Sequence, residues 1–398
     1  MILPLFLIAL ATLSAAVAVY GTLPQWVLHE HGMQIIEITR RLQWPLFTLS
    51  ILLCMTLAVL IIVGKKRAWW LIGFAPVLAL FAQQFATGSI NAYRILDNPP
   101  PVPAALAIVT DNEFVVGVRY GENYYAFPYR TLYYAPVIIQ NERERRYMLM
   151  WSAFANRAVA WHVTRQIQAR ELDIVSMPAN ALLIFNSRVG QFINGLTGMT
   201  PSGVKPEGFV CTVPTYKMPW ARWRALHPQT KVVQVTEMTT HVTSPVLPQF
   251  PIPPTTRPAD PASLDEAAVV TLIPSTNPVA LEQNSIPTRP VNIEVDGVPM
   301  LLFRDPATGV VRAYDRRFQG ITSRFIANYS SARAKRGVML LDVVTNSGWN
   351  LQGVAIDGEA AIKGSRLTAI PGIEEDLYWN VMKHWYPSLQ LLKPDTPR

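Results

Sequence analysis

The chain has few of the residues from which reactive sites are built. Its 398 residues include two cysteines and six histidines, and only 16% of them are charged. Cys54 lies in a long apolar run and Cys211 lies far along the chain, so we expect neither a disulfide framework nor a thiolate metal site. Gly-rich phosphate loops and the Gly-x-Ser-x-Gly motif of serine hydrolases do not occur. The sequence therefore predicts no cofactor, no metal and no catalytic residue.

Clustered positive charge is missing as well. The formal net charge is +8, from 35 Lys and Arg against 27 Asp and Glu, but no long basic run carries it. Nucleic-acid binding is therefore not expected. The excess of positive charge fits a surface close to an anionic bilayer or to an acidic partner equally well.

Apolar sequence, by contrast, is abundant and is concentrated near the N-terminus. Half of all residues are hydrophobic, a high share for a soluble protein. We predict that residues 1–97 form a membrane anchor with three transmembrane helices, at about 2–20, 45–63 and 69–87. Each segment approaches the ~20 residues that a bilayer requires. The first could instead be a cleaved signal peptide, but it lacks the positive residues that begin such signals, which favours a retained helix.

An amphipathic connector is expected between the first two helices. Residues 26–42 alternate apolar and charged side chains, and Trp26 and Trp44 stand near the two ends. Tryptophan is enriched at the boundary between lipid and water, so we take these two as candidate interface residues at the membrane face.

The orientation of the anchor follows from one basic turn. Residues 65–67 read Lys-Lys-Arg between the second and third predicted helices. The positive-inside rule places this turn, and with it the N-terminus, in the cytoplasm. The large C-terminal region is then periplasmic. Arg40 and Arg41 count against this orientation, because they would lie on the outer side of the inner membrane.

Beyond the anchor, short β segments dominate and their order recurs. Gly121-Glu122-Asn123 and Asp296-Gly297 each predict the turn of a β-hairpin. Trp220 stands eight residues before Pro228, as Trp379 stands eight before Pro387, and an apolar strand follows each proline. Such repetition is typical of a duplicated module. The predicted fold is a membrane-anchored α+β protein with two related, mainly-β extracytoplasmic modules, each closed by a short helix. We place these modules at residues 98–240 and 291–398, and the closing helices at 219–227 and 375–384.

A proline-rich segment, residues 241–290, separates the two modules. So many prolines prevent continuous helix or sheet, since proline lacks a backbone N–H and has a fixed φ. The segment is predicted to be a linker, or an extended arm that contacts a partner, with a short ordered element near residues 265–273. Pro251, Pro253 and Pro254 are its candidate interface residues.

Three short motifs stand out in the β region. Residues 126–130 read Ala-Phe-Pro-Tyr-Arg, residues 150–156 read Met-Trp-Ser-Ala-Phe-Ala-Asn, and the second module carries Asp342, Thr345, Ser347 and Trp349. These motifs resemble those of the bacterial family catalogued as domain of unknown function number 3179. That family shows Ala-Tyr-Pro-Leu-Arg, then a Trp-His-Glu step and Thr-Tyr-Cys-Pro-Leu-Cys-Gly, and later Asp-Arg-x-Thr-x-Ser-x-Trp, of which the last is kept in the second module.

The departures from the family are as informative as the matches. The two cysteines of the family fall on Ser152 and Ala155, and its histidine falls on Ala135. Paired thiols with an imidazole bind metals or perform thiol chemistry, and serine and alanine cannot replace them. The resemblance therefore implies a fold and an envelope location, with the most reactive group of the family lost.

One polar cluster remains as a candidate site, formed by Asp315, Asp342, Thr345 and Ser347, with Arg316 beside it. The alternative interpretation is a turn whose Asp, Thr and Ser side chains bond to nearby backbone groups. A group of aromatic residues could likewise bind a ligand, although such spacing is more typical of a helix packed on a sheet. The group comprises Trp220, Trp223, Trp379, Trp385 and Tyr386.

Three functional hypotheses follow. The first is a non-catalytic, membrane-anchored accessory subunit of a larger bacterial membrane complex, for example a photosynthetic or respiratory one, whose partners are other integral membrane subunits and the lipid bilayer. The second is a periplasmic module that binds a ligand or glycan through the aromatic group. The third is an envelope enzyme that uses the polar cluster. The absence of a catalytic set favours the first.

Overall fold

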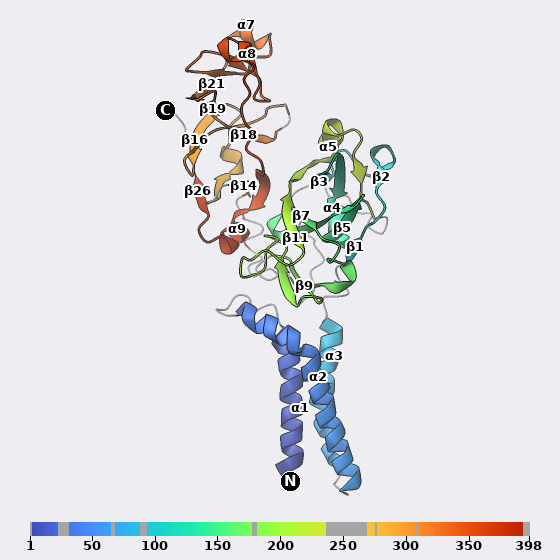
Figure 1. The fold of residues 1–398 in the computed structure, drawn as a ribbon. Helices are drawn as coiled ribbons and strands as arrows, with labels where there is room; N and C mark the ends of the chain where they lie inside the picture. Colours follow the sequence, from blue (N-terminus) through green and yellow to red (C-terminus); the bar gives the residue numbers. More distant parts are fainter. Residues whose placement is uncertain are drawn as a thin grey trace.

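The chain forms a helical stalk that supports a mainly-β region (Figure 1). The structure is a computed structural model, and it describes residues 2–22, 32–64, 68–87, 94–176, 181–235, 269–274, 277–307 and 309–392. Four of the candidate interface residues, Trp26, Pro251, Pro253 and Pro254, lie outside the described residues. The N-terminus lies at the end of the stalk that is far from the β region.

Two helices of the stalk are long and apolar enough to cross a membrane: α1 (Ile2–Tyr20) and α2 (Gly32–Val63). A 3₁₀ helix, η2 (Ala68–Phe74), and a shorter helix, α3 (Ala75–Thr87), follow them at the third predicted span. The second span was predicted to begin at Pro45, and the helix that contains it, α2, begins at Gly32 and continues through Pro45. Proline removes one helical hydrogen bond but does not end this helix, whose apolar face packs against α1 on both sides of it.

Small residues allow α1 and α2 to approach closely. Ala11, Ala15 and Ala18 are fully buried between the helices, an arrangement that is common where apolar helices pack in membranes. Polar side chains add three hydrogen bonds across the same seam. The Ser14 Oγ donates to the Leu46 carbonyl (2.8 Å), the Ser50 Oγ to the Ala11 carbonyl (2.9 Å) and the Gln43 Nε2 to the Ala18 carbonyl (3.1 Å). The outward faces remain apolar.

The first unit, residues 94–235, contains three sheets. One has the order β1-β5-β6-β7-β11, with bounds Ile95–Asp97, Val137–Glu142, Arg145–Ser152, Arg157–Val163 and Phe209–Val213. The second has the order β12-β3-β4-β13-β2, with bounds Thr215–Pro219, Phe114–Tyr120, Asn123–Pro128, Lys231–Val232 and Val102–Pro103. The third has the order β10-β9-β8, with bounds Gln191–Asn194, Leu183–Asn186 and Leu172–Ser176. The predicted hairpin at Gly121 is confirmed, with β3 and β4 paired on either side of it.

The second unit, residues 269–392, is built from four small sheets. The first has the order β25-β14-β15-β26, with bounds Glu374–Tyr378, Val269–Ile273, Val279–Glu282 and Gln390–Leu392. The others are β16-β17-β18 (Val291–Val295, Val298–Arg304, Val311–Asp315), β19-β20 (Arg317–Phe318, Ile321–Thr322) and β21-β22-β23-β24 (Phe325–Ala327, Leu340–Asp342, Gly348–Trp349, Ala355–Asp357). The turn at Asp296-Gly297 has positive φ at both residues, as the predicted hairpin requires.

The second unit begins earlier than the sequence predicted. β14 falls within the short ordered element predicted near residues 265–273, whereas β15 lies where a linker was predicted as far as residue 290. Together the two strands form the centre of a sheet. Pro274 and Pro278 flank the connection between these strands, so the strands themselves keep every backbone N–H. The closing helix is also shorter than predicted: residues 374–378 form β25, and only Trp379–Trp385 (α9) are helical.

The strand orders of the two units correspond. β12-β3-β4-β13 and β25-β14-β15-β26 have the same order, and in each the last pairing is parallel and the other two are antiparallel. A five-residue strand leads directly into a seven-residue helix in both units: β12 into α5 (Trp220–Leu226), and β25 into α9. The helices α5 and α9 therefore close their units in the same way.

The first unit is seated on the N-terminal turns of α2. Ile36 is fully buried there among Leu183, Phe185 and Phe192 of β9 and β10. The Arg41 guanidinium donates to the Gly190 carbonyl through two nitrogens, at 2.8 and 3.2 Å. These turns of α2 therefore belong to the contact between stalk and β region.

Candidate functional site at the junction of the two units

The predicted polar cluster forms, but without one of its members. The Asp342 carboxylate accepts hydrogen bonds from the Thr345 backbone N–H (2.7 Å), the Thr345 Oγ1 (2.7 Å), the Trp349 Nε1 (3.0 Å) and the Ser323 Oγ (3.3 Å). The Ser347 and Thr345 hydroxyl oxygens are hydrogen-bonded at 2.7 Å, and the Ser347 Oγ accepts from the Ala360 N–H (3.0 Å). Asp342 and Ser347 are buried, so these bonds tie a turn to its neighbours.

Asp315 does not join this cluster. Its carboxylate binds the Arg317 guanidinium two residues away, at 2.6 Å between Oδ2 and Nη2, and the side chain of Arg317 is largely exposed. Arg317 holds the pKa of Asp315 below its ordinary value. Arg316 is closer to the cluster, because its Nη1 donates to the Ser323 carbonyl at 2.8 Å. The grouping of Asp315 with Asp342 was therefore wrong.

The positions where the resemblance places two cysteines and a histidine do lie together. Backbone pairing between β5 and β6, with the Trp151 N–H bonded to the Pro136 carbonyl, brings Ala135 beside Ser152. Ser152 is fully buried, and its Oγ accepts from the Leu182 N–H (3.1 Å). Ala155 belongs to an apolar cluster that is otherwise formed largely by β25 and α9 of the second unit. An apolar contact between units occupies this place.

A charged clamp joins the two units beside that contact. The Arg157 guanidinium, at the start of β7, binds both oxygens of the Glu374 carboxylate at the start of β25, at 2.6 and 2.8 Å. Its Nη1 also donates to the Tyr386 hydroxyl at 2.6 Å. The Arg157 side chain is 11% exposed and that of Glu374 20%. A two-pronged pair in such a place is stronger than an exposed one and fixes the geometry of the contact.

Two residues of the first unit reach the backbone of β25. The Asn156 Nδ2 donates to the Asp376 carbonyl (2.8 Å), and the Lys217 Nζ of β12 donates to the same carbonyl (3.3 Å) and to the Asn156 carbonyl. Asn156 and Asp376 both have left-handed backbone conformations, with φ of 48° and 58°. Gln283 holds Asp376 from the other side through its side-chain amide.

Burial shifts the pKa values of the ionisable side chains at this junction. It lowers the pKa of Lys217 to about 8, with Asp376 and Glu374 acting in the opposite direction. Glu375 has a raised pKa, again because burial penalises the charged form, although its carboxylate accepts from the Val311 N–H (2.9 Å). Burial also opposes the charge of Arg157, but Glu374 and Tyr386 together outweigh it and raise the pKa of Arg157. The charged form of Lys217 is therefore unfavourable at this junction, because burial removes its ammonium group from water.

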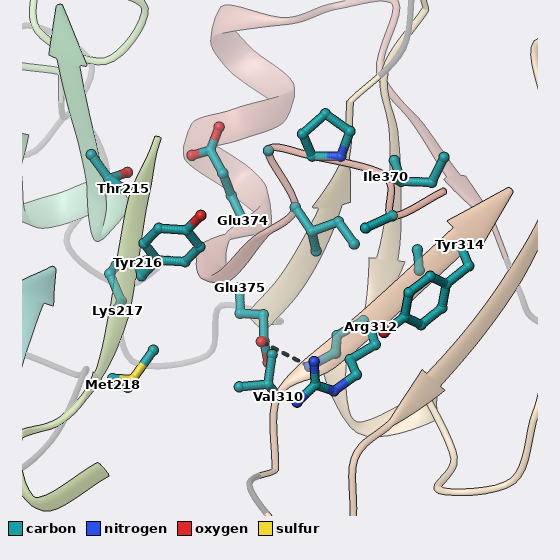
Figure 2. Close-up of a pocket in the computed structure, with 16 residues that line it drawn as sticks. Thr215, Tyr216, Lys217, Met218, Val310, Arg312, Tyr314, Ile370, Glu374 and Glu375 are labelled. Carbon is teal, nitrogen blue, oxygen red and sulfur yellow. Dashed lines mark hydrogen bonds between the residues drawn. The ribbon is translucent and has the colours of Figure 1, made fainter. Parts of the chain in front are cut away.

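A cavity of about 390 Å³ opens between the two units at this point (Figure 2). One wall is β12, from Thr215 to Met218, and the other is formed by residues 310–314 and 369–375. Figure 2 shows Tyr216 and Lys217 on one side of it, and Arg312 and Ile370 on the other. A cleft between two units is a common place for a ligand.

The aromatic group contributes little accessible surface to this cleft. Trp220 and Trp223 are 1% exposed, and Tyr386 is engaged by Arg157. Tyr216, which the sequence did not single out, lines the cleft and is 45% exposed. Within the described residues, no group of three His, Cys, Asp or Glu side chains could hold a metal ion.

Sequence reasoning missed Arg157, Lys217, Glu374 and Asp376. The one available signal was the acidic run Glu374-Glu375-Asp376 directly before the second aromatic helix. Contacts that join residues so far apart, such as the 217 positions between Arg157 and Glu374, have no local pattern.

Comparisons with known proteins agree with the motifs. A family model described as "Protein of unknown function (DUF3179)" matches residues 95–389. The chain therefore belongs to this family. No curated protein and no solved structure matches the chain.

Proposed function

We propose that this member of the DUF3179 family is a non-catalytic, membrane-anchored accessory subunit of a larger bacterial membrane complex. The observation that carries the proposal is the apolar contact of the second unit with Ala155, three residues after the buried Ser152. The second unit packs where the resemblance places one of two thiols, and Ala155, Ser152 and Ala135 supply neither thiol nor imidazole. The clamp of Arg157 and Glu374 holds the two units together, as a structural role requires.

The apolar outer surface of the helical stalk supports the proposal that this protein lies among other membrane subunits. Its seam is closed by Ala11, Ala15 and Ala18 and by hydrogen bonds, whereas its outer side chains are apolar and exposed, for example Leu52 (55%) and Ile62 (77%). Lipid chains and apolar helices of other subunits are the partners that such a surface fits. Energy-converting complexes, photosynthetic or respiratory, are examples of the assembly that we propose.

The proposed orientation has the β region in the periplasm and the N-terminus in the cytoplasm. α2 ends at Val63, far from the β region, and the basic residues 65–67, Lys-Lys-Arg, come next in the sequence, which is the order that the positive-inside rule favours. Arg40 and Arg41 no longer argue against this orientation. Arg40 lies 3.7 Å from Asp173 and Arg41 bonds to Gly190, so both serve the contact between α2 and the first unit.

We also propose that the two units arose by duplication. Their shared strand order, including the one parallel pairing, supports a common origin, as does the strand-to-helix step at Trp220 and Trp379. The second copy then contributes the surface that covers Ala155 in the first.

Co-purification tests the proposed function. The full-length chain, tagged at its C-terminus, is extracted in mild detergent from the native membrane, and proteins present in stoichiometric amounts are identified by mass spectrometry. We expect a defined set of integral membrane proteins. A chain that emerges alone and monodisperse would contradict the subunit proposal. An unrelated membrane protein with the same tag is the control for non-specific capture.

A chemical cross-linking step sharpens this experiment. Cross-links from the partner to the stalk residues would support contact within the bilayer, and cross-links to the two units would support a periplasmic contact. Without links to either region, co-purification would reflect shared detergent micelles rather than an interface.

A further inference from the structure

The first unit covers the outer edge of β13 with a strand that has no counterpart among the described residues of the second unit. β2 pairs antiparallel with β13, at the end of the sheet β12-β3-β4-β13-β2. The matching strand of the second unit is β26, and no strand within the described part of the chain pairs with its outer side. β26 therefore presents an edge whose backbone N–H and C=O groups another extended segment can pair with.

Strand pairing and helix positions fix which residues of the two units correspond. Pro219 directly precedes α5 and pairs with Phe114. Tyr378 directly precedes α9 and pairs with Val269. Phe114 and Val269 are therefore equivalent positions, and so are residues that stand equally far before them. Residues that stand equally far after the first residues of α5 and α9 are equivalent in the same way.

Equivalent residues at the two edges differ in exposure. Val232 of β13 and Leu391 of β26 stand twelve residues after the first residues of α5 and α9. Val232 is fully buried, in a cluster on which side chains of residues 102–109 pack. Leu391 is 41% exposed, and Trp379 is half-buried where Trp220 is 1% exposed. The second unit thus leaves exposed an apolar face that the first unit covers with its own chain.

The covering segment of the first unit has a definite pattern of packed and exposed positions. Leu106 and Ile108 are 70% and 63% exposed. The side chains that pack on the cluster around Val232 stand 12, 10, 7 and 5 residues before Phe114: Val102, Ala104, Ala107 and Val109.

The same pattern recurs in the sequence before Val269. The residues 12, 10, 7 and 5 positions before it are Arg257, Ala259, Ala262 and Leu264, so three of the four are apolar. The two positions that are exposed in the first unit correspond to Pro261 and Ser263. Residues 257–264 lie outside the described residues, but their sequence matches that of the covering segment.

Proline suits the position that it holds in both segments. The Ala104 N–H donates to the Thr230 carbonyl (3.2 Å), so the neighbouring Pro103 stands where β2 directs no N–H toward β13. Pro258 has the matching place, 11 residues before Val269. A proline there removes no hydrogen bond from the pairing, which is where edge strands tolerate it.

The backbone of β26 has room for such a strand. Leu389 is the counterpart of Thr230, and its carbonyl accepts from the Lys383 Nζ at 2.9 Å. A carbonyl oxygen can accept a second hydrogen bond, here from the Ala259 N–H. The aliphatic part of Arg257 can cover Leu391 while its guanidinium reaches water. The one departure from the apolar pattern is therefore compatible with this edge.

We propose that residues 257–264 of this chain bind to the open edge of its own second unit. Residues 257 and 258 pair antiparallel with β26, and the three apolar side chains that follow cover Leu391 and Trp379. The end of the proline-rich segment then belongs to the second unit, and only residues 236–256 remain for contact with a partner. The inference rests on the proposed common origin of the two units and goes beyond the proposed accessory role.

Disulfide formation in the full-length chain tests the pairing. Val102 stands opposite Val232, so the proposal places residue 257 opposite residue 391. The background is Cys54→Ala with Cys211→Ser, which removes both free cysteines. After mild oxidation in detergent, Arg257→Cys with Leu391→Cys should form a disulfide within one chain in more than half of the molecules, because paired strands hold such Cα atoms about 5.5 Å apart.

The matched control replaces Leu391→Cys by Gln390→Cys. Neighbouring side chains of a strand point to opposite faces of the sheet, so this pair should form at least tenfold less disulfide. Non-reducing gels and mass spectrometry of the linked peptides distinguish a bond within one chain from a bond between two chains.

Hydrogen exchange shows whether the segment covers the edge without any cross-link. The Val233 N–H donates to the Ala126 carbonyl of β4, so the N–H of the residue before it, and that of its counterpart Leu391, points to the outer side. We expect at least tenfold faster exchange of the Leu391 amide in Leu264→Asp, which places a charge at a packed position. Ser263→Asp, at the counterpart of an exposed position, should leave this exchange unchanged.

Any of three results would overturn the proposal: no disulfide within one chain for Leu391→Cys, equal yields for Leu391→Cys and Gln390→Cys, or equal exchange in Leu264→Asp and Ser263→Asp. Disulfides between two chains would also contradict it, because a second copy would then supply the segment. The outcome is separable from that of co-purification. A chain that emerges alone would leave the pairing with β26 standing, and a failed cross-link would leave a defined complex standing.

Discussion

Lys217 and Asp376 hold the same place in the two units and touch each other. Lys217 is the third residue of β12 and Asp376 the third residue of β25, and the Lys217 ammonium donates to the Asp376 carbonyl at 3.3 Å. The two strands have equivalent positions in their sheets and lie side by side. The units therefore meet through corresponding edges, joined by side chains in place of a backbone ladder.

The contact between Lys217 and Asp376 includes unfavourable free-energy contributions from both units. Asp376 and Asn156 adopt left-handed backbone conformations that cost of order 1 kcal/mol or more for residues other than glycine. Lys217 is held charged where burial opposes charge. The hydrogen bonds of Asn156, Lys217 and Gln283 to Asp376 offset part of this cost. Such strain is kept where a junction needs a fixed geometry.

The buried amine predicts an unusual dependence of stability on pH. The pKa of Lys217 is lowered from 10.5 to about 8 in the folded chain. Between these values the unfolded chain binds a proton that the folded chain has released, so the free energy of unfolding rises with pH. Below pH 8 both states carry the proton and the contribution is constant. We expect a gain of about 1 to 2 kcal/mol between pH 8 and 9.5 that Lys217→Met lacks.

The measurement is urea unfolding in detergent at several pH values, monitored by tryptophan fluorescence. The range should stop below pH 10, because burial raises the pKa of Tyr129 and Tyr133. Their unfolded forms lose protons first, which lowers stability at higher pH. Parallel pH curves for parent and Lys217→Met would show that Lys217 does not titrate in this range.

The clamp between the units predicts a large loss for Arg157→Leu. The change leaves the Glu374 carboxylate at a mostly buried position without its bidentate partner. We expect a loss of about 2 to 3 kcal/mol in the free energy of unfolding, at or just below the lower end of the range for fully buried pairs, because both side chains are partly exposed. Earlier protease cleavage between the units should accompany this loss.

An exposed ion pair provides the matched control. Arg224 and Asp111 lie 2.9 Å apart, but their side chains are 48% and 64% exposed. Pairs of this kind contribute about 0 to 1 kcal/mol, so Arg224→Leu should have little effect. If both variants lost the same stability, the clamp would be no more than a surface pair.

The elements with strong local signals were predictable from sequence. The hairpins at Gly121 and at Asp296-Gly297 formed as expected, because their turns use residues that tolerate positive φ. The linker prediction for residues 241–290 was wrong at its C-terminal end for a physical reason. Proline content over a window ignores where each proline stands, and here Pro274 and Pro278 stand outside β14 and β15.

The junction between the two units, by contrast, could hardly be predicted from the sequence. Asp315 lies near Asp342 along the chain, yet it pairs with its neighbour Arg317, and Asp342 turns to Thr345 and Trp349. Lys217 and Asp376 are 159 positions apart and come together only because two sheets meet at their edges. An alignment of the two units by strand would have placed them opposite each other, but it would not have placed the units in contact.

The Asp342 cluster predicts a structural effect for Asp342→Asn. The amide would turn an NH₂ group toward donors that now bond to the carboxylate, among them Thr345 Oγ1 and Trp349 Nε1. We expect a loss of about 2 to 3 kcal/mol in the free energy of unfolding. Thermal unfolding followed by near-UV circular dichroism measures it. Asp315→Asn is the control from the same predicted group and should cost less than about 1 kcal/mol, since Arg317 is exposed.

Activity separates this role from the enzyme hypothesis. A folded Asp342→Asn protein that retains the phenotype of the parent would agree with a structural turn. A folded variant that loses a measurable reaction would instead favour chemistry at Asp342, against the function proposed above.

The contact between the first unit and α2 predicts that Ile36→Ala destabilises the protein. Ile36 is fully buried among Leu183, Phe185 and Phe192, so Ile36→Ala removes packing that the neighbours cannot fully replace. We expect a cost of about 2 to 4 kcal/mol and faster hydrogen exchange of the amides of β9 and β10. Ile38→Ala, at a side chain that is 59% exposed, should change neither quantity measurably. Equal exchange in the two variants would mean that α2 supports the first unit only through Arg40 and Arg41, and that the orientation of the unit on the membrane depends on charge alone.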